Sequence, residues 1–281
     1  MSFLDQVDQA LVTHERVHLN FNSVKLAFPC GTLLFRAKLD TWIAKYPNKL
    51  VGRYPTDPVV EELFQHIGVL GLLNLPHRKN AITHDQVVHW HFHSGAVMDP
   101  TLYKDLTLSL RDRIVHPQRE LFADCLNEAV YNTVNHAYDF EVKGLPDRRL
   151  RKWWMFSQVK SGLVTVVILD LGVSIPRSLL QKPEWKDYAR LRKRDGQLIE
   201  AAACSTRTST RLPHRGKGLP EMLEFSENLA AGGLRILSRF GVFSFDASTK
   251  IMLRDKYYQA IPGTLVMWQI PISGGGNHEP T

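Results

Sequence analysis

A nearly continuous apolar run from Leu163 to Leu169 places the strongest constraint on the fold of this chain. Such a run predicts a strand that is buried inside a sheet. It ends at Asp170, and Gly172 follows, so we expect the carboxylate to lie in a crevice and not in solvent. A buried carboxylate needs a polar partner. Asp170 is therefore a candidate to accept a ligand amine, such as that of adenine; the alternative is a cap on the next helix.

Residues 118–138 carry the second clear pattern, because their apolar residues recur at helical spacing after Pro117. Glu128, Asn132 and His136 stand four residues apart, so a helix places them on one face. An amide oxygen can ligate a hard cation, and a carboxylate can polarise a water molecule. The pattern suits a metal-bound phosphate, although an ordinary polar helix face would produce it too.

A basic, glycine-rich turn precedes another predicted helix, which continues to Asn228. The turn contains Gly216, Lys217 and Gly218, with Arg215 just before them. Glycines let backbone amides approach a phosphate, and the N-terminus of a helix favours an anion. Basic glycine turns are common, so this pattern alone does not identify a phosphate site.

The remaining patterns predict an α/β protein, and 281 residues correspond to about two domains. Asp99-Pro100 marks the predicted boundary between a small α/β domain, residues 1–100, and a second domain, residues 101–281. In the first domain we expect helices at 3–15, 32–46 and 59–72 and strands at 17–21, 24–28 and 50–54. In the second we expect a helix at 196–204 and strands at 153–159, 163–169, 234–238, 242–246, 251–253 and 263–272.

Three alternating histidines, His89, His91 and His93, lie in the stretch from Gln86 to Ser94. On a strand they share one face, opposite Trp90 and Phe92. Three imidazoles at this spacing could bind zinc or copper. A half-exposed strand with histidine as its polar residue explains the same pattern. We favour that interpretation, because no Cys or Asp completes a known metal-binding spacing.

Composition narrows the class of protein. The net charge of +7 permits nucleotides, nucleic acids or acidic proteins as partners. Three cysteines, an odd number without metal-type spacing, fit a reducing compartment. The sequence has no apolar run of about 18 residues that would span a membrane, and its first residues lack the apolar core of a secretory signal. We therefore expect a cytoplasmic protein with no membrane partner.

The C-terminal patterns together resemble one known superfamily. The motifs E-x-x-x-N-x-x-x-H, D-x-G-x-x-I, G-K-G-L and a final G-T occur in the order found in GHKL ATPases. That superfamily includes gyrase, the ninety-kilodalton chaperones, mismatch-repair ATPases, histidine kinases and anti-sigma serine kinases. The resemblance covers residues 105–273. It implies a Bergerat fold, a mixed sheet with helices on one face, that binds ATP and Mg²⁺.

The resemblance implies a role for each matching residue at the phosphate end of the ligand. Asn132 would ligate the Mg²⁺ that bridges the phosphates. Glu128 would align or deprotonate the attacking water. Gly216 and Gly218 would wrap the phosphates, with Lys217 close by.

Other matching residues would surround the base. By resemblance, Asp170 would accept the adenine amine, and Gly172 would leave room for the ring. Thr264 would support the pocket through a water molecule beside Asp170, and His136 would have a structural role. The main departure is Ser174, where the family usually has a second glycine, so the close backbone approach at this point is not assured.

Many basic residues lie between 175 and 212, at the place of the family's ATP lid. The resemblance implies a mobile cover that orders on ATP, whereas a solvated helix face gives the same charge pattern. Basic residues here could also contact nucleic acid. We do not expect nucleic acid as the partner, because no aromatic residues alternate with them.

A second resemblance concerns the N-terminal part. Residues 17–34, V-H-L-N-F-N-S-V-K-L-A-F-P-C-G-T-L-L, are similar to the start of STAS-type domains. A STAS-like domain would imply a partner-recognition module. The family's phosphorylatable serine would fall near Thr32, and we do not transfer that role to it.

Three functions follow from these observations. The first is Mg²⁺-dependent ATP binding and hydrolysis that drives a conformational switch controlling a protein partner, which Glu128 favours. The second is a serine/threonine protein kinase resembling the anti-sigma kinases, because a compact ATPase domain stands beside a STAS-like segment. The third is a non-enzymatic nucleotide-sensing module of a regulatory or defence operon. A histidine kinase fits less well, because only His116 precedes the core helix and no heptad run accompanies it.

Overall fold

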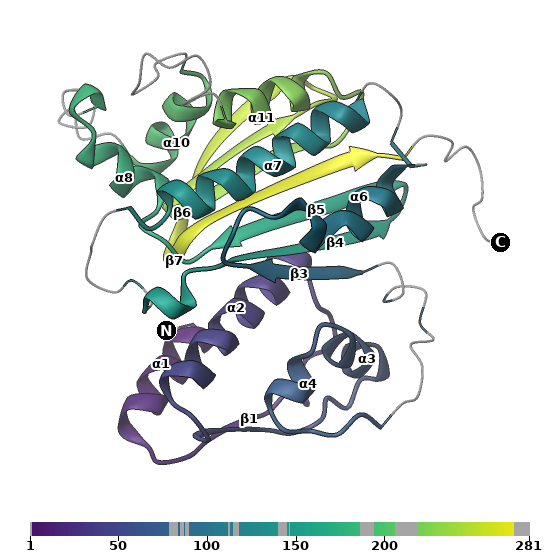
Figure 1. The fold of residues 1–281 in the computed structure, drawn as a ribbon, viewed down its shortest axis with the longest axis vertical. Helices are drawn as coiled ribbons and strands as arrows, with labels where there is room; N and C mark the ends of the chain where they lie inside the picture. Colours follow the sequence, from purple (N-terminus) through teal and green to yellow (C-terminus); the bar gives the residue numbers. More distant parts are fainter. Residues whose placement is uncertain are drawn as a thin grey trace.

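A five-stranded sheet forms the centre of the molecule (Figure 1). The computed structural model describes residues 2–78, 84, 87, 90–111, 113–114, 118–139, 145, 147–185, 194–205 and 218–272. Within these residues the strand order is β3-β4-β5-β7-β6. The strands are β3 (His91–Gly95), β4 (Trp153–Lys160), β5 (Leu163–Asp170), β6 (Gly233–Asp246) and β7 (Ile251–Pro271).

Every neighbouring pair in this sheet is antiparallel, so the expected mixed sheet is wrong. The reason lies in the connections, because short turns join two pairs of neighbouring strands. β4 and β5 are joined at Ser161-Gly162, where the sequence predicts a turn, and both residues have positive φ. A turn of residues 247–250 joins β6 to β7.

Strand β5 is buried on both faces, as its apolar run predicts. Val164, Val166 and Ile168 pack into the core beneath the C-terminal helices. Val167 and Leu169 point the other way, into the core shared with the N-terminal part. The run therefore reflects a sheet covered on both sides, and it does so without any parallel pairing.

The first face carries the helices that follow β3 in the chain. These are α6 (Lys104–Arg111), α7 (Gln118–His136), α10 (Asp195–Ala203) and α11 (Gly218–Glu227). Ala129 and Val130 of α7 are buried against the sheet, which confirms the predicted apolar face of that helix. The short α8 (Ile175–Gln181) follows β5 and packs beside α10. Three single 3₁₀ turns lie at Pro100–Tyr103, Arg148–Leu150 and Pro183–Trp185.

The N-terminal part is a smaller α/β unit, as expected. It contains α1 (Phe3–Thr13), β1 (Val17–Leu19), α2 (Pro29–Lys45), β2 (Leu50–Gly52), α3 (Pro58–His66) and α4 (Val69–Leu72). β1 and β2 pair in parallel through the crossover helix α2. The predicted strand at 24–28 is wrong, because the chain turns at Val24 and Pro29 begins α2. The predicted helix at 59–72 breaks at Gly68, whose φ is +74°.

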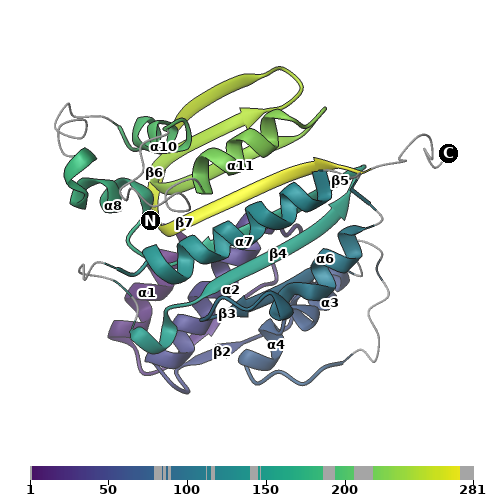
Figure 2. The same ribbon diagram turned by 45° about the horizontal axis from the view of Figure 1, so that its top comes forward.

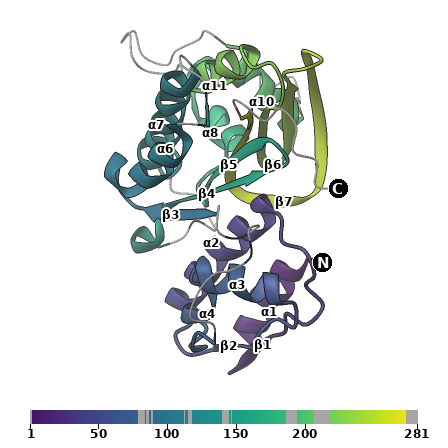
Figure 3. The ribbon, with the colours of Figure 1, turned by 90° about the vertical axis from the view of Figure 1, so that its right-hand side faces the viewer.

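This N-terminal unit packs against the second face of the sheet (Figure 3). Helix α2 lies against β4 and β5, and Leu33 and Ala37 are part of the shared core. The indole Nε1 of Trp154 donates a hydrogen bond of 2.8 Å to Asp40 Oδ2. Strand β3 precedes the predicted boundary at residue 100, yet it pairs with β4 in the C-terminal sheet.

Four predicted strands at the C-terminal end form two long ones. β6 and β7 pair as one hairpin, and the register shifts between Ser238 and Gly241. The shift bends the hairpin, and helix α10 packs against its distal part (Figure 2). Within the described ranges, every helix is too short or too polar to cross a bilayer.

Candidate functional site

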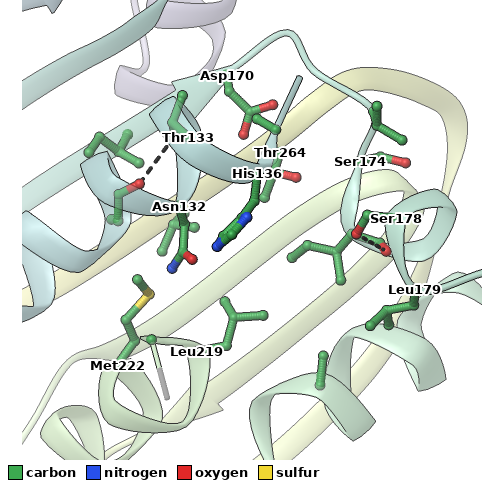
Figure 4. Close-up of a pocket in the computed structure, with 18 of the residues that line it drawn as sticks. Asn132, Thr133, His136, Asp170, Ser174, Ser178, Leu179, Leu219, Met222 and Thr264 are labelled. Carbon is green, nitrogen blue, oxygen red and sulfur yellow. Dashed lines mark hydrogen bonds between the residues drawn. The ribbon is translucent and has the colours of Figure 1, made fainter. Parts of the chain in front are cut away.

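A cavity of about 210 Å³ opens where α7, α8 and the start of α11 meet one end of β5. Four of the residues expected to bind the ligand line it, namely Asn132, Asp170, Gly218 and Thr264. They come from α7, the end of β5, the start of α11 and β7. Figure 4 shows Asp170 beside Thr264 at one end, with Asn132 and His136 extending from α7. Segments far apart in the sequence thus meet at one place.

Asp170 is buried at the end of β5, as the apolar run before it predicts. Its Oδ1 accepts a hydrogen bond of 2.7 Å from Gly172 N, and the backbone of Thr264 also stabilises the ionised form. Burial outweighs both contacts and raises the pKa of Asp170 to about 7. Ionisation of Asp170 in the cavity therefore costs free energy, and a hydrogen-bond donor on a ligand would lower that cost.

Thr264 belongs to a polar cluster that sequence reasoning missed. Its Oγ1 lies 3.0 Å from Ser238 Oγ, which also accepts a hydrogen bond of 2.9 Å from Ile175 N. Ser238 is fully buried and donates to the carbonyl of Gly263 at 2.9 Å. The cluster ties β6, β7 and the start of α8 together behind Asp170. No local signal marks Ser238, because its importance depends on pairing with Thr264 across the strands.

The structure gives Gly172 a packing reason to be glycine. A Cβ at this position would lie 2.1 Å from the carbonyl oxygen of Ala137. The carbonyl of Ala137 instead accepts a hydrogen bond of 2.7 Å from Val173 N. The missing side chain lets the end of α7 approach the loop after β5. Gly172 itself does not line the cavity.

Ser174, the departure from the family pattern, adopts a backbone conformation that glycine prefers. Its φ is +82° and its ψ is 149°, a region that side chains rarely enter. Its Oγ is buried and has no hydrogen-bond partner in the described part of the chain. Ser174 lines the cavity, but its hydroxyl oxygen is itself buried.

At the other end of the cavity, Glu128 and Asn132 of α7 lie against Gly218 at the start of α11. A Cβ on Gly218 would lie 2.4 Å from Asn132 Nδ2 and 2.6 Å from Glu128 Oε1. Glycine therefore permits the helix start to approach both side chains. Glu128 is half-buried just beyond the cavity lining, and burial together with the charge of Glu221 raises its pKa. A carboxylate with a raised pKa suits acceptance of a proton.

Two of the predicted phosphate residues, Gly216 and Lys217, lie outside the described residues, as do residues 186–193 and 206–212 of the basic segment. From that segment, Lys182 and Trp185 do line the cavity. His136 lines it as well, and its Nδ1 lies 3.1 Å from Asp139 Oδ2. The remaining wall is largely apolar, with Leu219 and Met222 of α11 among its residues, and suits a flat, uncharged ring.

Comparison with known protein families and with curated proteins was negative. No protein-family model matches this chain, and a search of the curated proteins finds no match.

Proposed function

We propose that this cavity binds ATP with Mg²⁺ and that the protein hydrolyses it to drive a switch that controls a protein partner. One observation carries the proposal, namely that Asn132, Asp170, Gly218 and Thr264 line one cavity although they lie in four separate segments. Chance patterns in a sequence have no reason to converge in this way. We also propose a Bergerat-type fold for residues 105–273, although its sheet is antiparallel and not mixed as that fold implies.

The base would bind at the end that holds Asp170. A carboxylate there can accept a hydrogen bond from an exocyclic amine, which compensates for its burial. The hydroxyl of Thr264, which also lines the cavity, offers a further polar contact. Apolar side chains such as Leu179 and Met222 would contact the ring. Base recognition therefore depends on few polar groups in a largely apolar pocket.

The phosphates would lie at the end that holds Asn132 and the start of α11. Gly218 begins α11 there, and the N-terminus of this ten-residue helix favours an anion. Asn132 would hold the magnesium ion through its amide oxygen, and the ion would neutralise phosphate charge when bound. Glu128, next to Asn132, would accept a proton from the attacking water, for which its raised pKa is favourable.

Calorimetric titration with ATP, with and without Mg²⁺, tests this proposal. We expect Asp170→Asn to weaken binding about ten- to hundredfold, because it replaces the acceptor of a charged hydrogen bond worth about 1.5–3 kcal/mol. Asn132→Ala should lose the Mg²⁺-dependent part of the affinity and keep the rest. Asn135→Ala is the matched control, because Asn135 is an exposed amide on the same helix. Wild-type affinity in Asp170→Asn, or wild-type protein that ignores ATP, would refute the proposal.

Phosphate release from the same variants separates hydrolysis from binding alone. Glu128→Gln should keep ATP binding and release phosphate at least about a hundredfold more slowly. Asp124→Asn, an exposed carboxylate on α7, should release phosphate at the wild-type rate. Tight binding without turnover would identify a nucleotide sensor instead. Transfer of labelled phosphate to a protein hydroxyl would identify the kinase alternative.

A further inference from the structure

Two histidines and one aspartate meet at the edge of the sheet, on strand β3. His91 and His93 belong to β3, and Asp105 belongs to the first turn of α6. One potential ligand atom from each residue lies within 4.8 Å of the other two. His93 Nε2 is 3.3 Å from Asp105 Oδ1, and His91 Nδ1 is 3.9 Å from Asp105 Oδ2. None of the three lines the nucleotide cavity.

The local fold explains why these side chains meet. Strand alternation puts His91 and His93 on one face, with their rings nearly parallel at 6.5 Å, while Phe92 packs on the opposite face. The sequence predicts this shared face, and the described histidines confirm it; His89 lies outside the described residues. After β3 the chain turns back through Pro100–Tyr103, so α6 begins beside the strand. The turn supplies the carboxylate that sequence spacing alone does not reveal.

His93 presents a ring nitrogen that could hold a metal ion. Its Nε2 is buried and makes no hydrogen bond within the part of the chain that the structure describes. A buried ring nitrogen without a hydrogen bond can accept a metal ion as its partner.

We propose that His91, His93 and Asp105 form a binding site for Zn²⁺. Two imidazole nitrogens and one carboxylate oxygen are a common ligand set for zinc, whereas Mg²⁺ and Ca²⁺ prefer oxygen ligands throughout. The Asp105 side chain is 63% exposed, so solvent can supply a fourth ligand. A bound ion would join β3 to α6. The site is independent of the nucleotide proposal, since it shares no residue with the cavity.

Metal titration of the tag-free protein, after treatment with a chelator, tests the site. We expect one equivalent of Co²⁺ to give the visible absorption of a low-coordinate ion, and Zn²⁺ to displace it. Zn²⁺ should also raise the thermal unfolding midpoint of the wild-type protein. His91→Asn and Asp105→Asn should each weaken Zn²⁺ binding at least about tenfold and lose the thermal shift.

Control variants separate a loss of Zn²⁺ binding from a loss of folding. His18→Asn removes an exposed histidine from β1 and should bind Zn²⁺ as the wild type does. Asp105→Asn keeps the oxygen that accepts a hydrogen bond from Leu106 N, so it should fold even where a substitution of the more buried His93 does not. The proposal is wrong where the wild type binds less than one equivalent, or where Asp105→Asn and His91→Asn bind Zn²⁺ with wild-type affinity.

Discussion

Replacing Ser174 by glycine should stabilise this protein, although most substitutions of a buried residue destabilise. Ser174 holds φ at +82° and ψ at 149°, a region that is nearly reserved for glycine. Occupying it with a side chain costs about 1–3 kcal/mol. A buried hydroxyl without a partner, such as its Oγ, adds a further cost of about 1–3 kcal/mol. Glycine removes both costs at once.

One opposing effect reduces the gain. Glycine makes the unfolded chain more flexible, which favours unfolding by about 0.4–1 kcal/mol. The net increase in the free energy of unfolding should therefore be about 1–5.6 kcal/mol. Ser174→Ala separates the two contributions, because alanine removes the hydroxyl and keeps the strained Cβ. We expect its gain to be smaller than that of Ser174→Gly.

Urea unfolding measures this difference. The midpoint should move to higher urea for Ser174→Gly while the slope stays constant, since the surface exposed on unfolding is unchanged. Ser178→Gly provides a matched control in the neighbouring helix α8, where glycine relieves no strain and should lower the midpoint. An unchanged or lower midpoint for Ser174→Gly would show that the backbone at this position is not strained as described.

Three further changes test the same region and its support. Burial raises the pKa of Asp170 from 3.8 to about 7, so its stabilising contribution is complete below pH 4 and is lost as the pH rises through 7. Between pH 4 and 8 the free energy of unfolding of the wild type should fall by about 4 kcal/mol through this group, and urea unfolding of Asp170→Asn should not show that fall. An equal pH dependence in the wild type and the variant would contradict this. Gly263→Ala should destabilise by at least about 2 kcal/mol, because φ is +69° and a Cβ would lie 2.0 Å from the carbonyl oxygen of Asp170; a wild-type thermal midpoint would be inconsistent with this. Trp154→Phe should lower the free energy of unfolding by about 2–3 kcal/mol, because the hydrogen bond to Asp40 is lost. The N-terminal unit and the sheet should still melt together, and separate melting transitions would contradict a shared core.

The sequence predicts those residues of the candidate site that are marked by local patterns. Helical spacing put Asn132 on the same face as Glu128, and an apolar run placed Asp170 at the buried end of a strand. Ser238 was not accessible, because it matters only through Thr264 on the neighbouring strand. Gly172 was singled out as room for a ligand ring, whereas the contact in the structure that requires glycine is with the carbonyl of Ala137, just after α7.

The amino-acid sequence by itself determined most of the helices and strands and which of their faces are apolar, because these depend on the spacing of neighbouring residues. It therefore predicted the two-sided burial of β5 and the shared face of His91 and His93. It did not determine the region of residues 24–28, the break at Gly68 or the joining of four predicted strands into β6 and β7. Only the tertiary structure decided that every strand pair in the sheet is antiparallel and that Asp105 joins the two histidines. Both depend on which distant segments meet, and the spacing of neighbouring residues carries no record of that choice.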